Sequence, residues 1–218
     1  MPHPLRTSVD DFIEGLRGFE RDLITKENVR HYMDEVRLSA EELKPYTFWR
    51  DEYYTRNLIY RDNLFEVMAI CWAPGQKTAI HTHNGSLGWM TVAQGEMAVH
   101  NYKYLSCNAP ENQEVIGMDC LAGATHIEMD RMETDVCSDT SPTACVDKHH
   151  TIHQIENVDK TKLGCVSLHV YAPPIDSCVG FDLEKQKCFR KTLCYYSRFG
   201  TVEVEAEQQP GGPLRILS

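Results

Sequence analysis

The sequence predicts a mainly β protein, a barrel or sandwich of short strands that follows an N-terminal helical segment. From Tyr46 onward, short runs of β-branched and aromatic residues follow one another, separated by Gly, Pro, Asn and Asp. Many short strands at such spacing are typical of a sandwich or barrel and not of an alternating α/β fold. The runs that predict the main strands are residues 57–60, 65–72, 87–92, 97–104, 165–171 and 191–196.

Residues 8–45 have the apolar spacing of helices. Ser8 or Asp10 can cap a first helix, in which apolar side chains recur at helical spacing. A second helix is predicted over residues 26–36, and a third opens at Ser39, where a glutamate three residues later completes a capping box. We expect these helices to pack against the barrel.

Residues 105–148 interrupt the succession of strands. The stretch is acidic and has few aliphatic residues, so we expect a long excursion with a hairpin around residues 118–129. Loops of this length are usually functional or flexible. The whole chain fits one domain. The expected parts of this single domain (1–218) are a helical leader (1–45), the barrel (46–200) and a C-terminal tail (201–218).

Composition and charge exclude several classes of protein. The net charge of −10 argues against a nucleic-acid partner, because phosphate contacts require clustered Lys and Arg. No apolar run approaches the roughly 20 residues of a membrane helix. The first residues also lack the basic-then-apolar pattern of a secretion signal. We therefore expect a cytoplasmic protein without a membrane or nucleic-acid partner.

The nine cysteines are expected to be mostly reduced and buried. No two of them form a Cys-x-x-Cys pair, so neither a zinc knuckle nor a thioredoxin-like motif has support. An odd number in a cytosolic chain is best interpreted as small apolar residues. The alternative is a disulfide within residues 105–148. The cysteines of that stretch are Cys107, Cys120, Cys137 and Cys145.

Three histidines from two distant stretches can form a metal site. His81 and His83 are separated by one residue, so on a strand both project from the same face. Such a pair alone is weak evidence, because surface strands show it by chance. His153, in an alternating stretch after the excursion, can complete a facial set of three imidazoles. Three neutral ligands leave positions open for a chelating substrate and dioxygen, which favours redox-active iron over zinc.

Three polar residues share one face of a predicted strand. Ser167, His169 and Tyr171 alternate along the run 165–171. They form either a satisfied polar edge or a hydrogen-bonded network that supports a nearby site. The other histidines are expected to be solvent-exposed or hydrogen-bonded; they are His3, His31, His100, His126, His149 and His150.

These motifs resemble those of a known family. The pattern Gly75-x5-His81-x-His83 is similar to the first cupin motif, and His153-x3-Asn157 is similar to the second. Within the cupins, the chain resembles cysteine dioxygenase from about residue 45 to residue 200, apart from the excursion. The stretches that carry this likeness are residues 54–58, 152–157 and 167–178. The resemblance implies a cupin, a jelly-roll-like β-barrel.

The resemblance also implies an activity and a cofactor. The chain would be a thiol dioxygenase that adds both atoms of O2 to the sulfur of L-cysteine and gives cysteine sulfinic acid. Fe(II) would be held by His81, His83 and His153. The partners would be a small-molecule thiol and O2, and the sequence does not indicate an oligomeric state.

The family likeness assigns roles to further residues. Arg56 would pair with the substrate carboxylate, which a guanidinium fork fits bidentately. From the residues alone, Arg56 could equally be a surface arginine. Tyr171, held by His169 and Ser167, would hydrogen-bond near the substrate and dioxygen. Two residues are expected to line the substrate pocket, Tyr54 and Cys178.

The chain departs from the family pattern in two places. Animal cysteine dioxygenases carry a cysteine that cross-links to the active-site tyrosine, and the aligned residue here is Gly88, as in many bacterial relatives. Tyr171 should therefore keep an unmodified phenol. The usual cupin glutamate is also missing, which leaves three neutral ligands. The second departure is the stretch 105–148, which could cover the pocket or mediate association.

Two other functions remain open. A sister enzyme that acts on 3-mercaptopropionate or another thiol carboxylate usually carries glutamine in place of Arg56, which favours cysteine here. A cupin that binds zinc or nickel, and acts as an isomerase or a binding module, would take up no oxygen and contain no iron.

Overall fold

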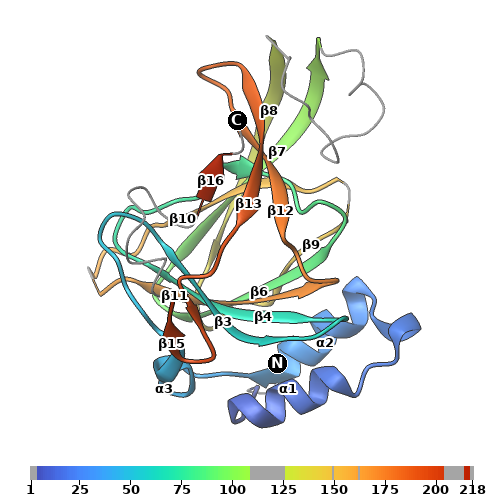
Figure 1. The fold of residues 1–218 in the computed structure, drawn as a ribbon, viewed down its shortest axis with the longest axis vertical. Coiled ribbons are helices and arrows are strands. Elements are labelled where there is room, and N and C mark those ends of the chain that lie inside the picture. The colour runs from blue at the N-terminus through green and yellow to red at the C-terminus, as the bar shows by residue number, and fades with distance from the viewer. Residues whose placement is uncertain (1–3, 109–125, 149, 162, 204–213, 217–218) are drawn as a thin grey trace.

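Two seven-stranded sheets form the body of the protein, with helices on one side (Figure 1). The computed structural model describes residues 4–108, 126–148, 150–161, 163–203 and 214–216. The mainly β fold with an N-terminal helical segment, predicted from the spacing of short strands, is confirmed. Within the described residues, no helix is long and apolar enough to cross a membrane.

The first sheet has the strand order β15-β14-β3-β4-β11-β6-β9. Its strands are β3 (Thr55–Arg61), β4 (Glu66–Trp72), β6 (Leu87–Gln94), β9 (Ala144–Val146), β11 (Cys165–Ala172), β14 (Ser197–Arg198) and β15 (Thr201–Val202). Both faces of β11 are buried along its whole length. This strand therefore separates two packed layers.

The second sheet has the order β16-β13-β12-β5-β10-β7-β8. Its strands are β5 (Ile80–His81), β7 (Met97–Cys107), β8 (Ile127–Cys137), β10 (Ile152–Asn157), β12 (Ser177–Asp182), β13 (Lys187–Leu193) and β16 (Leu214–Ile216). Apolar residues of the two sheets belong to one core cluster, among them Met68 and Ile70 of the first sheet and Val99 and Ile155 of the second. The space between the sheets is thus the interior of the barrel.

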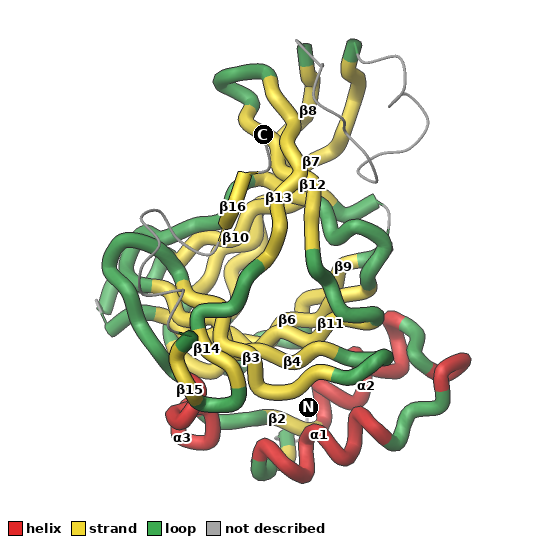
Figure 2. The backbone as a smooth tube through the Cα atoms, in the orientation of Figure 1, coloured by secondary structure: helices red, strands yellow, loops and turns green. Residues whose placement is uncertain are grey.

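The helices cover the outer face of the first sheet (Figure 2). They are α1 (Val9–Arg17), η1 (Arg21–Leu23), α2 (Lys26–Glu35), α3 (Ala40–Leu43) and η2 (Lys44–Tyr46), with a short parallel pair β1 (Leu5–Arg6) and β2 (Val36–Arg37) beside them. Ser8, Thr25 and Ser39 cap the three α-helices by accepting a hydrogen bond from a backbone N–H three residues later. Phe12 and Leu16 pack in the same cluster as the outward residues of β11.

The long excursion is more regular than the sequence predicts. Residues 105–148 read as loop with one hairpin, but β7 and β8 pair from Met97↔Cys137 to Cys107↔Ile127, and β9 pairs with β6. The local signal is weak because most of β8 is exposed, so its side chains show no apolar alternation. Residues 118–125 of the expected hairpin lie outside the described residues, and 127–129 belong to β8.

Two details near the C-terminus also differ. The strand expected over 191–196 lies earlier, as β13 (Lys187–Leu193), and the expected tail contributes β15 and β16 to the sheets.

Cys188 is disulfide-bonded. Among the cysteines that the structure describes, the other seven are free, in line with the expectation of mostly reduced thiols; they are Cys71, Cys107, Cys137, Cys145, Cys165, Cys178 and Cys194.

Candidate metal centre and substrate pocket

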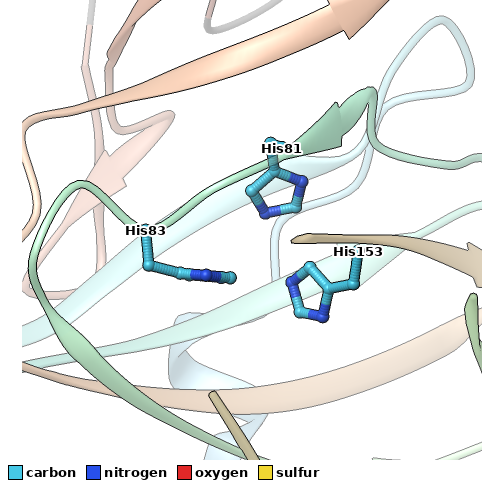
Figure 3. A group of neighbouring side chains, drawn as sticks. All are labelled: His81, His83 and His153. Carbon is cyan, nitrogen blue, oxygen red and sulfur yellow. The ribbon is translucent and has the colours of Figure 1, made fainter. Parts of the chain in front are cut away.

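Three histidines converge inside the barrel (Figure 3). His81 ends the short strand β5 and is the cross-strand partner of His153 on β10, while His83 follows two residues later. Their ring centroids are 4.7 to 5.1 Å apart, and their ligand atoms lie within 4.8 Å of one another. Strand pairing thus brings together the three residues that the sequence places in two separate stretches.

The environment keeps these imidazoles neutral. Burial is the main cause that lowers the pKa of His81 to about 4, and the Lys191 and Arg56 cations lower it further. Burial and the neighbouring histidines hold the pKa values of His83 and His153 well below the ordinary value. Neutral imidazole is the form that binds a metal ion.

Unpaired nitrogen atoms make the cluster fit a metal ion. Within the described part of the chain, Nδ1 of His83 and Nε2 of His153 are buried and have no hydrogen-bond partner. Buried polar atoms without a partner are costly, and a bound cation would satisfy both. Nδ1 of His81 lies 2.9 Å from the carbonyl of Ala79, which leaves its Nε2 as the ligand atom. Three neutral nitrogen ligands suit iron, zinc, nickel or copper.

A chain of hydrogen bonds runs beside the histidines. Nε1 of Trp72 donates to Oγ of Ser167 at 2.9 Å, and Ser167 Oγ lies 2.9 Å from His169 Nε2. His169 Nδ1 lies 3.3 Å from the hydroxyl of Tyr171. Because the indole can only donate, we assign the Ser167 hydroxyl as the donor to Nε2, and Nδ1 of His169 then carries the proton. The phenolic proton of Tyr171 is therefore free to point into the cavity.

This row of hydrogen-bonded side chains is uncharged and lies fully inside the barrel. Burial lowers the pKa of His169 to about 3 and raises the pKa of Tyr171 above its ordinary value. The predicted alternation of Ser167, His169 and Tyr171 places all three on the inner face of β11, because Leu168 and Val170 pack in the cluster with the helices. The row borders the site and is no exposed polar edge.

Gly88 has no room for a side chain. A Cβ at this position would lie 2.6 Å from Cγ2 of Val146 and 2.9 Å from Cε1 of Tyr171. Gly88 is the cross-strand partner of both residues, Val146 on β9 and Tyr171 on β11. The volume that a cross-linking cysteine would need is thus occupied by a side chain from the excursion.

Arg56 is buried, which excludes a surface arginine. It is 4% exposed, and its Nη2 lies 3.5 Å from Oε1 of Glu66, which is fully buried. Glu66 also accepts hydrogen bonds from the Tyr195 hydroxyl at 2.5 Å and the Ile175 N–H at 2.8 Å. Within the described residues, Nη1 of Arg56 has no hydrogen-bond partner. The guanidinium group is thus held by Glu66 at Nη2, and its Nη1 is available to bind a ligand.

The expected pocket residues line a small cavity of about 40 Å³. Tyr54 stacks on Trp72 with 4.5 Å between ring centroids, and Cys178 is buried beside them. Arg56 and His81 line the same cavity. Arg56 and two of the three clustered histidines, His81 and His83, therefore face one space, as carboxylate binding next to a metal requires.

A larger cavity of about 490 Å³ meets the histidines from another side. His83 and Tyr171 border both cavities. Residues 141–146 of the excursion form part of its wall, and Lys26 and Arg30 of α2 line it as well. The excursion thus contributes to the surroundings of the site.

Sequence reasoning missed four residues of this site. Glu66 is a lone acid at the start of an apolar run, which is a usable signal of a buried ion pair. Trp72, Val146 and Lys191 carry no local signal, because their places depend on the pairing of distant strands.

The β-barrel thus encloses a buried cluster of three histidines that could hold a metal ion. The model of the family "Cysteine dioxygenase type I" matches residues 5–184. The chain belongs to the cysteine dioxygenase type I family and is a dioxygenase, so the resemblance stated from the motifs is confirmed.

Curated relatives match over most of their length. Cysteine dioxygenase type 1 of Danio rerio is 25% identical over 195 residues, which are 88% of each chain. The Homo sapiens protein of that name is 26% identical over 183 residues, 84% of this chain and 82% of the relative. Among solved structures, the protein TT1209 from Thermus thermophilus aligns with a TM-score of 0.40 and 16% identity, over 60% of this chain and 93% of that one.

Proposed function

We propose that this protein is an iron-dependent thiol dioxygenase that oxidises L-cysteine with O2 to cysteine sulfinic acid. The observation that carries the proposal is the small cavity shared by Arg56, whose Nη1 has no partner within the described residues, and by His81 and His83 of the three-histidine cluster. The curated relatives named cysteine dioxygenase type 1 support the same substrate. Both atoms of dioxygen end on sulfur in this reaction.

His81, His83 and His153 would hold the iron. When bound, iron supplies the redox chemistry that couples a thiol to dioxygen. The histidines bring no negative charge, so the cavity favours an anionic ligand such as a thiolate. Burial of His83 and His153 keeps bulk water away from the reacting sulfur.

Arg56 would bind the substrate carboxylate. Its Nη2 is held by Glu66, so Nη1 is presented without the entropy cost of ordering a free side chain. Tyr54 and Cys178 shape the space between this cation and the histidines. A small thiol anchored by its carboxylate then has its sulfur restricted to the metal side of the cavity, which is a proximity effect.

Tyr171 would act as a neutral hydrogen-bond donor to the substrate or dioxygen. Ser167 and His169 orient its hydroxyl, and burial keeps its proton in place at neutral pH. Because Gly88 supplies no thiol, the phenol stays unmodified. The ring therefore offers the ordinary hydroxyl of a tyrosine to the cavity.

Purified protein is first loaded with Fe(II) under anaerobic conditions. The test is then its oxygen uptake when thiol and oxygen are supplied. We expect uptake with L-cysteine and a product heavier than the substrate by two oxygen atoms. Uptake with 3-mercaptopropionate and none with cysteine would assign the sister activity. A protein that retains only zinc or nickel, and consumes no oxygen after iron loading, would refute the proposal.

A further inference from the structure

Lys191 is a buried lysine in the wall of the small cavity. It lies on β13 directly opposite Cys178 of β12, and both residues line the cavity with Arg56 and His81. Lys191 is only 7% exposed. Lysine is almost never buried this fully without a partner.

Within the described part of the chain, the ammonium group of Lys191 forms no ion pair with a carboxylate. Its surroundings are a thiol, Cys178, and a like charge, Arg56. Burial, the largest cause, and Arg56 lower the pKa of Lys191 to about 8, against a smaller opposite effect of Cys178. The lysine is therefore still largely charged at neutral pH, in a place where it needs an anion.

The charges around the cavity identify what that anion is. Arg56 is already matched by Glu66 at 3.5 Å, so this ion pair is neutral as a unit. Apart from a bound metal ion, the positive charge without a countercharge among the described residues that line the cavity is that of Lys191. A substrate with one carboxylate would bring the cavity wall to neutrality, and it would contact the edge of Arg56 that has no partner.

We propose that Lys191 is a second anion-binding residue of this pocket, which holds the substrate carboxylate jointly with Arg56. The inference rests on the proposed function and deepens it. The pocket selects small thiols that carry a carboxylate, and it discriminates against thiols that carry only an amine. Selection by Lys191 comes from charge neutralisation, whereas Arg56 supplies directional hydrogen bonds.

The test compares Lys191→Met with wild type. It uses two thiols, cysteine and cysteamine, and one carboxylate without sulfur, propionate. Met matches the length of the lysine stem and lacks its charge. For iron-loaded protein, we expect the KM for cysteine to rise about tenfold or more. A change of this size corresponds to the loss of roughly one charge-assisted hydrogen bond. Cysteamine, which has the same thiol and amine without the carboxylate, should lose no affinity in Lys191→Met, because it has no anion for Lys191 to bind. Lys191→Arg should keep most of the affinity for cysteine.

Lys187→Met is the matched control, because Lys187 lies on the same strand and is exposed. It should leave both substrates unaffected. If Lys191→Met changes the KM for cysteine and cysteamine by the same factor, or changes neither, the proposal is wrong.

Calorimetric titration with propionate separates this inference from the proposed function. Propionate needs no oxygen and no turnover, so its affinity reports on anion binding alone. We expect at least tenfold weaker binding to Lys191→Met than to wild type, with Lys187→Met unchanged. If wild type oxidises no thiol, the proposed function fails, and the propionate affinities still decide whether Lys191 binds a carboxylate. Equal propionate affinities would overturn the role of Lys191 while leaving the oxidation of cysteine intact.

Discussion

Replacing Gly88 by alanine tests how tightly the excursion packs against the site. The new Cβ would lie 2.6 Å from Val146 and 2.9 Å from the ring of Tyr171, both closer than real Cβ contacts allow. Overpacking of this kind costs about 1–3 kcal/mol. For a chain of this size, about 1 kcal/mol corresponds to roughly 2–4 °C in Tm. We therefore expect Gly88→Ala to melt several degrees below wild type.

A double-mutant cycle with Val146→Ala assigns this cost to the contact. Val146→Ala alone removes two methyl groups, a loss of about 1.6 kcal/mol at roughly 0.8 kcal/mol each. In the double variant the alanine at 88 gains space, so the two effects should be less than additive by about 1 kcal/mol or more. Urea unfolding of the four proteins measures the coupling.

The same variants report on Tyr171. Part of the strain in Gly88→Ala pushes the tyrosine ring, so kcat with cysteine should fall in Gly88→Ala and recover partly in the double variant. Additive stabilities, with coupling below about 0.5 kcal/mol, would refute the claim that Val146 fills the space beside Gly88.

Three further predictions address the metal, the hydrogen-bond chain and the charge of the pocket. His153→Ala should lose bound iron, measured by elemental analysis, whereas the exposed His31→Ala keeps it; equal iron content would contradict the ligand assignment. Ser167→Ala should lower kcat about tenfold and the free energy of unfolding by about 1–3 kcal/mol at unchanged iron content, because His169 loses its orienting partner. An unchanged kcat would show that the hydrogen bonds through Ser167 and His169 do not position Tyr171. Propionate affinity should be nearly constant between about pH 6 and 7 and fall as pH rises through about 8, where Lys191, facing Cys178 and Arg56, loses its proton. Propionate stays ionised throughout, so Lys191→Met should show no such fall, and calorimetry at several pH values measures both.

The chemistry of the site could be predicted from local sequence patterns. Two histidines separated by one residue share a strand face, and Ser167, His169 and Tyr171 alternate on another, because side chains alternate along any strand. Each pattern needs only a few consecutive residues. Local patterns therefore identify candidate residues for the metal cluster and for the hydrogen-bonded row, whereas strand pairing decides that His153 joins His81 and His83.

The excursion shows where such patterns fail. β8 runs through an acidic stretch whose composition predicts a loop, and it is held by the backbone ladder with β7 rather than by burial. A ribbon exposed on most of its surface has no reason to alternate apolar and polar residues. The backbone hydrogen bonds between β7 and β8 do not depend on side-chain type, so the amino-acid composition does not reveal them.

The sequence by itself determined the mainly β class, the three candidate histidines and the shared strand face of Ser167, His169 and Tyr171. Only the tertiary structure decided which residues complete the pocket. Val146 lies against Gly88, and Lys191 lies opposite Cys178, because strand register pairs them across gaps in the chain. Register is set by the packing of the whole barrel, so no window of sequence contains it. The charge balance that assigns a role to Lys191 exists only once these strands are side by side.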